Sequence, residues 1–420
     1  MQGNSTSQPR PSRGHLAIIT APLAGHLNPV QVLAGALIDR GWRVSVVHVE
    51  GARRFMTHPA LEFAALPGGG EAGLAPYLAT LVNPGGPIRL TRMIRATAAM
   101  TDRLLAEAPA VLERIGATAV LADGVEPAGP LIARKLALPY AVAVTGLPLL
   151  TEADVPPPYL GWRYRPDALG RFRNRSGYAI TEWLMRPATR VLDARRRAWG
   201  LPAEGEPARI QVAQCPAGLD YPRRALPPEF HYGAPWRAVE TEALPLPDDA
   251  RPLVFCSLGT LQGSRRALFA TMAEACALVG ARAVIGHGGG LSAGEEAGLP
   301  GDPLVRAFWP QAAVLRRCSA AVLHGGFNSV LDALAAGVPV VALPIGFEQP
   351  GTAARLVRIG AGRMLSPQRL SARALADALR DVMVQPSYRQ AARGIAAEIA
   401  RGGGADRAAA AITAALTPAV

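Results

Sequence analysis

The sequence contains little cysteine, and its cysteines are far apart. Among 420 residues there are four, Cys215, Cys256, Cys276 and Cys318, and none forms a C-x-x-C pair with another. Disulfide-stabilised domains are rich in cysteine, and structural zinc sites use closely spaced pairs. The spacing therefore argues against both and fits a reducing compartment.

Lysine is nearly absent, although the formal net charge is +12. Lys135 is the only lysine, and the arginines are spread along the chain instead of forming the short basic block of a nucleic-acid-binding patch. The chain has no zinc-finger or RNA-binding signature, and its lysine is not part of the G-x-x-x-x-G-K pattern of a P-loop. We therefore expect no nucleic-acid partner.

Long apolar runs are missing as well. The uncharged apolar run 136–151 contains Pro139 and Pro148 and is shorter than the roughly 20 apolar residues of a membrane-spanning helix. Residues 1–13 are polar and contain no apolar segment of the kind found in a signal peptide, so we interpret them as a flexible tail. These features predict a cytoplasmic protein that neither spans a membrane nor is exported.

Glycine and proline are abundant, with 44 and 38 residues, and they separate apolar segments without a fixed period. The lack of a period excludes collagen-like and low-complexity chains, while the length favours two globular domains. Segments with strand and helix periodicity alternate in both halves of the chain. This alternation is typical of α/β proteins with parallel sheets.

The first half begins with a predicted βαβ unit. Asn28 is a good N-cap and Pro29 suits the first helical position, so we expect His26 in the loop at the carboxyl end of the first strand. Open α/β sheets bind ligands at this end. The predicted elements of this half are strands at 15–22, 43–49, 118–123 and 140–145, and helices at 30–38, 90–112 and 127–136.

The alternation of predicted strands and helices resumes in the second half, after a proline-rich segment at 226–247. Its predicted elements are strands at 252–257, 281–286, 304–309, 320–326 and 338–344, and helices at 265–279, 328–336, 372–384 and 390–415. The pattern predicts an α/β fold of two Rossmann-like, doubly wound domains facing a central cleft. We expect a tail at 1–13, an N-terminal domain at 14–235, a linker at 236–250, a C-terminal domain at 251–395 and a helix at 396–420 that packs back toward the N-terminal domain.

Polar and small residues follow the apolar strand that ends near His324. Gly325 and Gly326 let the backbone approach a ligand closely. Asn328 and Ser329 then begin a helix whose unpaired N–H groups and dipole favour an anion. The loop is therefore a candidate site for a diphosphate.

Residues on either side of this loop suit the rest of a nucleotide sugar. Trp309 offers a flat face for a base, and Gln311 offers an amide for the base edge or the ribose. Asp332 can accept hydrogen bonds from ribose hydroxyls, and Glu348 and Gln349 could hold sugar hydroxyls. Taken alone, Trp309 would favour a place in the hydrophobic core, because large aromatic side chains are usually mostly buried. The occurrence of all these residues in this order favours a site for a nucleotide sugar.

The same stretch resembles the nucleotide-sugar signature of the family 1 glycosyltransferases, which are inverting enzymes of GT-B fold that use a UDP-sugar. The shared pattern is W-P-Q, H-G-G-F-N-S, G-V-P, a proline and an acid followed by Gln, in order over about forty residues. The resemblance implies the following contacts: Trp309 to uracil; Gln311 and Asp332 to ribose; His324, Asn328 and Ser329 to the diphosphate; Glu348 and Gln349 to glucose.

Two positions depart from the plant members of this family, which usually have Trp at 327 and Glu at 332. Phe327 would contact the donor through its backbone, and Asp332 has a shorter reach. Ser257, Gly259 and Thr260, at another strand end, resemble the family's second phosphate-contacting loop. The same residues could form an ordinary turn.

The segment around His26 also resembles this family, whose catalytic histidine lies at this position. An acceptor hydroxyl must lose its proton to attack a sugar, and an imidazole with a pKa near 6.5 can take it at neutral pH. The resemblance places Asp123 beside His26, where it would stabilise the imidazolium; Glu126 is a second candidate for this role. The alternative for His26 is a structural loop histidine that bonds to the backbone, and the alternative for Asp123 is a helix N-cap.

The leaving UDP requires neutralisation of its charge, and the chain has no Asp-x-Asp triplet to hold a metal. The helix N-terminus at Asn328, with His324, would do this instead. We expect no metal and no cofactor, with UDP-glucose as the donor substrate. A single attack on the α-linked donor would give a β-glycoside.

Further segments resemble the carotenoid branch of the family, the zeaxanthin glucosyltransferases. They lie at 123–139, 172–202, 211–224 and 347–356. The resemblance implies a hexosyltransferase whose acceptor is a hydroxylated carotenoid such as zeaxanthin. A macrolide, polyketide or glycolipid acceptor and a GT-B nucleotide-sugar epimerase are the alternatives.

Residues 162–175 combine arginines with aromatic residues. Trp162, Tyr164 and Phe172 alternate with Arg163, Arg165, Arg171, Arg173 and Arg175. This composition is typical of a surface that meets anionic lipid, and also of an ordinary solvated face. A carotenoid acceptor would lie in a bilayer, so we expect peripheral contact with the inner face of the membrane.

Overall fold

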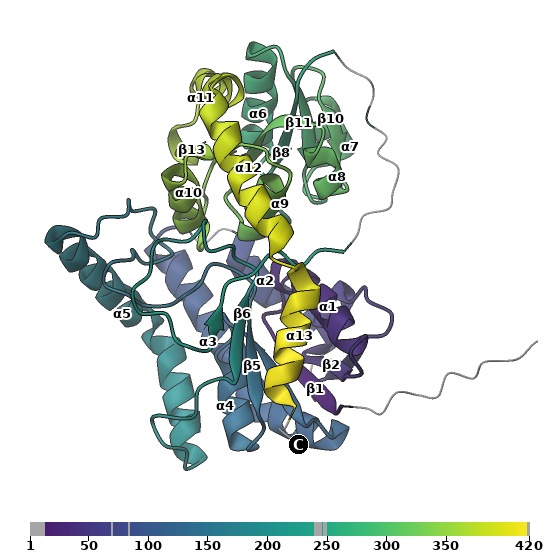
Figure 1. Cartoon of the computed structure of the whole chain (residues 1–420). Coiled ribbons are helices and arrows are strands. Elements are labelled where there is room, and N and C mark those ends of the chain that lie inside the picture. Colours follow the sequence, from purple (N-terminus) through teal and green to yellow (C-terminus); the bar gives the residue numbers. More distant parts are fainter. Residues whose placement is uncertain (1–12, 69, 83–84, 239–245, 247–249, 418–420) are drawn as a thin grey trace, which may run out of the picture.

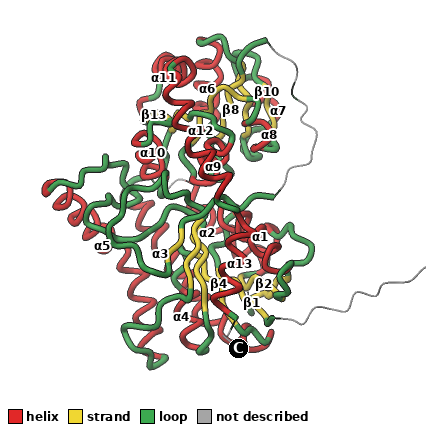
Figure 2. The backbone as a smooth tube through the Cα atoms, viewed as in Figure 1, coloured by secondary structure: helices red, strands yellow, loops and turns green. Residues whose placement is uncertain are grey.

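A computed structural model describes residues 13–68, 70–82, 85–238, 246 and 250–417. It has two lobes, and in each a parallel sheet lies between helices (Figures 1 and 2). The predicted fold of two Rossmann-like α/β domains is therefore confirmed. All but the last residue of the predicted tail and most of the predicted linker lie outside the described residues.

The first lobe is built on seven parallel strands in the order β3-β2-β1-β4-β5-β6-β7. The strands are β1 (His15–Ile19), β2 (Arg43–His48), β3 (Glu62–Ala65), β4 (Ala119–Asp123), β5 (Tyr140–Val144), β6 (Ile210–Ala213) and β7 (Phe230–His231). The helices are α1 (Ala24–Ile38), α2 (Ala75–Val82), α3 (Pro87–Ile115), α4 (Ala128–Lys135) and α5 (Ala168–Ala198), with short 3-10 turns at Glu50–Phe55 and Glu71–Leu74.

The second lobe has six parallel strands in the order β10-β9-β8-β11-β12-β13. The strands are β8 (Leu253–Ser257), β9 (Arg282–Gly286), β10 (Leu304–Arg306), β11 (Cys318–Leu323), β12 (Val340–Ala342) and β13 (Gly362–Met364). The helices are α6 (Arg266–Leu278), α7 (Ala293–Ala297), α8 (Gln311–Leu315), α9 (Phe327–Ala335), α10 (Gln349–Arg358), α11 (Ala372–Val384), α12 (Pro386–Arg401) and α13 (Gly404–Leu416), with a 3-10 turn at Pro367–Arg369.

The apolar strands are buried on both faces, as parallel sheets require. In β1, Leu16 and Ile18 pack with α1 and α13, whereas Ala17 and Ile19 pack with α3 and α4. In the second lobe, α9, α10 and α12 cover one face of the sheet, and α6 and α11 cover the other. The alternation of side chains along each strand thus fixes the helices on either side.

The strand order places ligand-binding loops at a defined point in each sheet. Chain connections diverge between β1 and β4 in the first sheet and between β8 and β11 in the second. Loops that follow strands at such a switch point leave a crevice at the carboxyl edge. His26, Asp123, Ser257 and His324 all follow or end these four strands.

The first helix begins earlier than the sequence predicts. α1 starts at Ala24, so His26 lies in its first turn and not in a loop, and Pro29 lies inside the helix. The N-cap preference of Asn28 is overridden because Leu27 is buried against the sheet. Extension of the helix toward β1 gains this apolar contact.

The segment predicted as one closing helix at 390–415 is two helices. α12 and α13 are separated by Gly402 and Gly403, and Gly403, the N-cap of α13, adopts a left-handed φ of 70° that interrupts a right-handed helix. α12 packs on α9, and α13 packs on α1 in the first lobe (Figure 1). α13 therefore returns the chain to the first lobe, while Glu398 of α12 also accepts a hydrogen bond from the Gly218 N–H of that lobe.

No helix among the described residues combines the length and the apolar composition needed to cross a bilayer.

Candidate active site

His26 and Asp123 are in contact at the switch point of the first sheet. His26 lies in the first turn of α1, which follows β1, and Asp123 is the last residue of the neighbouring β4. His26 Nδ1 is 2.9 Å from Asp123 Oδ2. The Asp123 side chain is fully buried, whereas 21% of the His26 side chain is exposed. The imidazole therefore lies between a buried carboxylate and the molecular surface.

Hydrogen bonds around Asp123 determine the tautomer of His26. Thr20 Oγ1 donates to Asp123 Oδ2 at 2.7 Å, and Thr145 Oγ1 donates to Asp123 Oδ1 at 3.0 Å. Thr145 has thus used its proton, and its oxygen accepts from His26 Nδ1 at 2.8 Å. Because both partners of Nδ1 are acceptors, a neutral His26 carries its proton on Nδ1 and a lone pair on Nε2.

The two groups also change each other's pKa. Burial by itself lowers the pKa of His26, but the charge and hydrogen bond of Asp123, with smaller contributions from Glu348 and Glu126, raise it above its usual value. Burial opposes ionisation of Asp123, but His26 and the two threonines hold its pKa below the usual value. An ionised carboxylate beside a more basic imidazole suits general base catalysis.

Glu126, the alternative partner for His26, has other contacts. Its Oε1 accepts hydrogen bonds from Thr101 Oγ1 at 3.0 Å and from the Ala128 N–H at 3.1 Å. Burial raises the pKa of Glu126 to about 7. Glu126 therefore anchors the start of α4, and Asp123 is the carboxylate that contacts His26.

The loops after β8 and β11 meet at the switch point of the second sheet. Gly259 has a φ of +70°, and a Cβ there would lie 2.8 Å from the His324 ring, so this close approach requires glycine. Ser257 Oγ donates to the Gly286 carbonyl at 3.0 Å and accepts from the Gly259 N–H at 3.2 Å. These bonds hold the loop against His324, while Thr260 at its end is exposed.

His324 is neutral and has an unpaired polar atom. Burial lowers the pKa of His324 to about 4, so the ring is uncharged at neutral pH. Within the described residues, its Nδ1 is buried without a hydrogen-bond partner. A buried polar group without a partner is costly unless a ligand or water satisfies it. His324 is therefore able to contribute a hydrogen bond, but no charge, to a bound anion.

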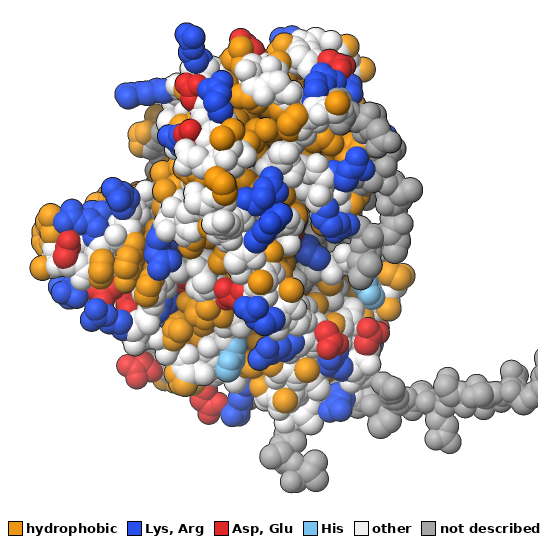
Figure 3. Space-filling view, turned by 45° about the horizontal axis from the view of Figure 1, so that its top comes forward, with side chains coloured by type: hydrophobic (Ala, Val, Ile, Leu, Met, Phe, Trp, Pro, Cys, Tyr) orange, Lys and Arg blue, Asp and Glu red, His pale blue; other side chains and the backbone are white. Residues whose placement is uncertain are grey.

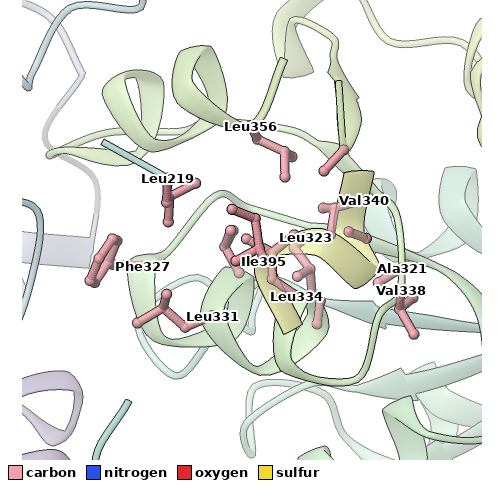
Figure 4. Packing of buried hydrophobic residues seen from close by; sticks show 14 of the residues in the cluster. Leu219, Ala321, Leu323, Phe327, Leu331, Leu334, Val338, Val340, Leu356 and Ile395 are labelled. Carbon is pink, nitrogen blue, oxygen red and sulfur yellow. The ribbon is translucent and has the colours of Figure 1, made fainter. Parts of the chain in front are cut away.

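α9 begins directly after Gly325 and Gly326, so the free N–H groups of its first turn lie next to His324. Ser329 is half-buried in this turn. The Phe327 side chain is buried in a hydrophobic cluster with Leu219 and Leu331 (Figure 4). Of Phe327, only the backbone is available to a ligand.

Asn328 connects the two lobes. Its Nδ2 donates to the Gly25 carbonyl, in α1, at 2.6 Å. Pro29 has no N–H to bond with the carbonyl four residues before it, so the Gly25 carbonyl is left for a partner outside the helix. Gly25 precedes His26. His26 and the N-terminal end of α9 therefore lie at one junction.

Arg237 joins the polar residues of this junction. Its Nε donates to Asp332 Oδ1 at 2.5 Å and its Nη2 to Asn328 Oδ1 at 3.1 Å. Its Nη1 donates to Gln214 Oε1 at 2.9 Å, and Gln214 Nε2 donates to Asn328 Oδ1 at 2.8 Å. Asp332 Oδ2 accepts from Gln311 Nε2 at 2.6 Å. The structure thus brings both predicted ribose contacts together beside a positive charge.

Trp309 is half-buried close to the end of β10. Its Nε1 donates to the Ile285 carbonyl at 2.9 Å, and the Arg306 guanidinium lies 4.4 Å from the ring centre. The hydrogen bond fixes the plane of the indole. A base would stack on the face opposite Arg306 or displace this side chain.

Glu348 and Gln349 lie at the start of α10 in different surroundings. Gln349 Oε1 accepts from the N–H groups of Ile345 and Gly346 at 2.8 and 3.0 Å, so the amide oxygen supports its own loop. Burial raises the pKa of Glu348, and the charge of Glu348 contributes to the raised pKa of His26. Glu348 is therefore the member of this pair whose carboxyl group acts electrostatically on His26.

Sequence reasoning missed four polar residues of this site: Thr20, Thr145, Gln214 and Arg237. Three of them directly follow strands β1, β5 and β6. Because the carboxyl ends of parallel strands share one edge of the sheet, this position was the signal that could have found them. Arg237 lies between the sheets of the two lobes, where no sequence pattern marks it.

Comparisons with known proteins place the chain among glycosyltransferases. A family model described as the C-terminal domain of erythromycin biosynthesis protein CIII-like proteins matches residues 293–404. The chain is 35% identical to the zeaxanthin glucosyltransferase of Pseudescherichia vulneris, over 84% of this chain and 86% of that protein. It is 32% identical to the zeaxanthin glucosyltransferase of Pantoea ananas, over 90% of each protein.

A solved structure shares the fold over the whole length. The glycotransferase of kitacinnamycin matches with a TM-score of 0.75 and 21% identity, covering 97% of this chain and 100% of that chain. This likeness supports the GT-B architecture of two facing α/β domains. Given this fold and the identity to the two curated relatives, the chain belongs to the family 1 glycosyltransferases.

Proposed function

We propose that this glycosyltransferase moves glucose from UDP-glucose to a hydroxyl group of a hydroxylated carotenoid such as zeaxanthin, with inversion at the anomeric carbon. The observation that carries the proposal is the His26–Asp123 pair, held beside the N-terminus of α9 by the bond from Asn328 to Gly25. Transfer from a nucleoside diphosphate to an alcohol needs a base and an anion-binding site at one place.

In the proposed reaction His26 is the general base. The acceptor oxygen attacks C1 of glucose and loses its proton to His26 Nε2, while the bond from C1 to the β-phosphate oxygen breaks. That electron pair leaves with UDP, and attack opposite the leaving group converts the α-linked donor to a β-glucoside. Asp123 remains ionised and stabilises the imidazolium through Nδ1.

The diphosphate is proposed to bind at the first turn of α9. Asn328, Ser329 and the neutral His324 donate hydrogen bonds there, with the backbone of Gly326 and Phe327. The helix dipole and the nearby Arg237 guanidinium offset the charge that develops on UDP. Backbone and hydroxyl groups of the loop that contains Ser257, Gly259 and Thr260 complete the cradle.

The remaining donor contacts are proposed as the sequence predicts them. Trp309 stacks on uracil, Gln311 and Asp332 bind ribose, and Glu348 and Gln349 bind glucose. For Asp332 this requires an exchange, since its carboxylate bonds Arg237 and Gln311 in the unliganded protein. A diphosphate that draws Arg237 toward itself would release Asp332 to the ribose hydroxyls. No metal or cofactor takes part in the proposal.

The acceptor assignment is supported by the two curated relatives, both zeaxanthin glucosyltransferases that match at least 84% of this chain. A carotenoid diol has hydroxyl groups on apolar rings and partitions into lipid. Peripheral contact with a membrane is therefore part of the proposal.

The test is an incubation of purified protein with UDP-glucose, first alone and then with zeaxanthin, with product analysis by chromatography and mass spectrometry. We expect zeaxanthin glucosides only when both substrates are present. Formation of an epimer from UDP-glucose alone would overturn glucosyl transfer as the activity. Glucosylation of a macrolide or a glycolipid in place of zeaxanthin would overturn the acceptor, and a preference for another nucleotide sugar would overturn the donor.

A further inference from the structure

α5 exposes an apolar stripe to solvent. Leu169, Phe172, Ile180 and Trp183 are each between 59% and 69% exposed, far more than large apolar side chains in a packed helix. Their spacing places all four along one face of the helix. α5 projects from the side of the first lobe (Figure 1), and these four side chains remain exposed although Trp162 and Arg173 line a shallow groove together with Leu169, Phe172 and Ile180.

Another face of α5 is held firmly against the protein. Gly170, Asn174, Gly177 and Ala188 are buried at helical spacing, and a Cβ on Gly177 would lie 2.7 Å from the Trp162 ring. Asn174 Nδ2 donates to the Ala153 carbonyl at 2.9 Å. The exposed stripe therefore cannot turn inward without loss of these contacts.

The surroundings of the stripe are strongly positive. Between residues 163 and 190 there are seven arginines and two acidic residues, Asp167 and Glu182. Within the part of the chain that the structure describes, no ion pair is formed by Arg175, Arg186 or Arg190. Figure 3 shows hydrophobic and basic side chains together on the projecting region. An apolar stripe bordered by unpaired arginines complements an anionic lipid surface.

The start of α5 is linked to the candidate active site. The loop before it packs on the second lobe: a Cβ on Gly161 would lie 3.3 Å from Pro350, and a Cβ on Gly351 would lie 2.0 Å from the Pro158 carbonyl. Pro350 and Gly351 directly follow the proposed glucose ligands. In the same loop, burial and the charge of Glu348 raise the pKa of Tyr159 to about 12. A surface that binds α5 would thus lie near Glu348 and Gln349, the proposed glucose ligands.

We propose that the exposed face of α5 docks on an anionic bilayer, with Leu169, Phe172, Ile180 and Trp183 inserted at the level of the headgroups and the arginines paired with lipid phosphates. The consequence for catalysis rests on the proposed function: docking brings the site to an acceptor dissolved in the membrane. The binding itself requires neither donor nor acceptor.

The first experiment measures co-sedimentation of the full-length protein with vesicles in the absence of substrates. Vesicles of phosphatidylcholine are compared with vesicles that also contain phosphatidylglycerol, at low and high salt. We expect at least about tenfold tighter binding to the anionic vesicles, and weakening by salt, because each basic residue near such a surface contributes about fivefold.

Two sets of variants separate the apolar and charged contributions. Phe172→Ser with Trp183→Ser should weaken binding by about tenfold or more, because inserted aromatic area is lost. The triple change Arg175→Gln, Arg186→Gln and Arg190→Gln should weaken it similarly and reduce the salt dependence, whereas the corresponding lysine triple should keep it. The matched controls are Val384→Ser, at a residue 72% exposed in the second lobe, and Arg373→Gln, also exposed; both should bind as the wild type does.

Three results would overturn the docking surface. They are wild-type binding that does not distinguish anionic from neutral vesicles, α5 variants that bind like the controls, and a dimer of the free protein that the α5 variants abolish. The last result would assign the stripe to a second copy of the chain.

The second experiment compares zeaxanthin embedded in vesicles with zeaxanthin in detergent micelles. The α5 variants should glucosylate the vesicle-bound acceptor more slowly and the micellar acceptor at the wild-type rate. Equal loss in both would overturn docking as the cause, since it indicates damage to acceptor binding. If the wild type glucosylates neither, the proposed function fails while the vesicle result stands.

Discussion

The carboxylate of Asp123 accepts hydrogen bonds from His26, Thr20 and Thr145, and each of these bonds favours its ionised form. The ionised form in turn keeps the proton of neutral His26 on Nδ1. Three groups at the carboxyl ends of β1, β4 and β5 therefore determine that Nε2 of the neutral His26 carries the lone pair.

His26→Ala is expected to lower kcat by about 10²- to 10⁴-fold, which is the usual contribution of a positioned general base. UDP affinity, measured by titration calorimetry, should change little, because in the proposal His26 contacts the acceptor. His231→Ala, at an exposed histidine of the same lobe, is the control and should leave both quantities unchanged. Equal losses of kcat and UDP affinity in H26A would contradict the role.

Asp123→Asn is expected to shift the pH profile of kcat/KM. His26 acts in its neutral form, so activity falls as the pH drops through its pKa, which Asp123 raises above the usual value. Removal of the charge lowers this pKa, so the acid limb should move to lower pH, while the plateau falls by up to about 10⁴-fold. Glu126→Gln should shift the limb less. A lower plateau with an unmoved limb would indicate a purely structural role for Asp123.

At the scale of elements, the two lobes contribute loops that require unusual backbone. Pro29 leaves one carbonyl of α1 without a partner inside the helix, and Asn328 of α9 uses it. Gly259 allows the loop after β8 to touch the His324 ring. At Pro29 the helix loses a backbone hydrogen bond, and the free Gly25 carbonyl accepts one from Asn328. At Gly259 the backbone adopts a positive φ, and the loop can contact the His324 ring.

Gly259→Ala tests the approach of this loop to His324. A Cβ at Gly259 would lie 2.8 Å from the ring, so the loop must move, and the donor KM should rise by about tenfold while thermal stability also falls. Gly280→Ala is a matched control, because Gly280 has the same φ of +70° but no atom within 4 Å of its Cβ position. Both variants carry a backbone cost of about 1 kcal/mol. A donor KM that changes equally in both would contradict a specific role for the loop.

At the scale of the whole molecule, the lobes are joined by a continuous core and a buried ion pair. Leu219 and Phe230 of the first lobe belong to the same hydrophobic cluster as Phe327 and Leu331 of the second. Asp220 Oδ1 accepts from Arg355 Nε, on α10, at 2.8 Å, and both side chains are at most 1% exposed. The position of α10, and hence of Glu348 at its start, depends on this joint.

Asp220→Asn should destabilise the protein strongly. It leaves Arg355 and Arg223 buried without their counter-charge, and loss of one partner of a buried pair typically costs about 3 to 5 kcal/mol. Asp377→Asn removes an exposed ion pair with Arg380 and should cost less than about 1 kcal/mol. Urea unfolding of both variants measures the difference. Similar values for the two would show that Asp220 does not stabilise the joint.

The elements differ in how well the sequence predicts them. The helix predicted at 372–384 is α11, because its apolar residues face the sheet at helical spacing. α5 was not predicted: its buried residues are Gly170, Asn174, Gly177 and Ala188, and although Val191 and Leu192 pack on the core, the large apolar residues of its first half, with Trp183, are exposed. Hydrophobic periodicity marks a buried face only where that face is apolar.

The contacts of the candidate site also differ in how well the sequence predicts them. The family resemblance paired His26 with Asp123, which ends a neighbouring apolar strand, and the structure brings them together. The contact between Arg237 and Asp332 could not be predicted, because Arg237 lies in no repeating element and its partner belongs to the other lobe.

The sequence by itself determined the two α/β halves, the positions of the loops and the donor motif, because strand and helix periodicity, glycines and caps act over a few neighbouring residues. Only the tertiary structure decided that Asn328 reaches Gly25, that Arg237 holds Asp332 and that α5 carries its apolar stripe outward. These contacts join residues far apart in the chain, and their geometry follows from how the two lobes pack on a shared core.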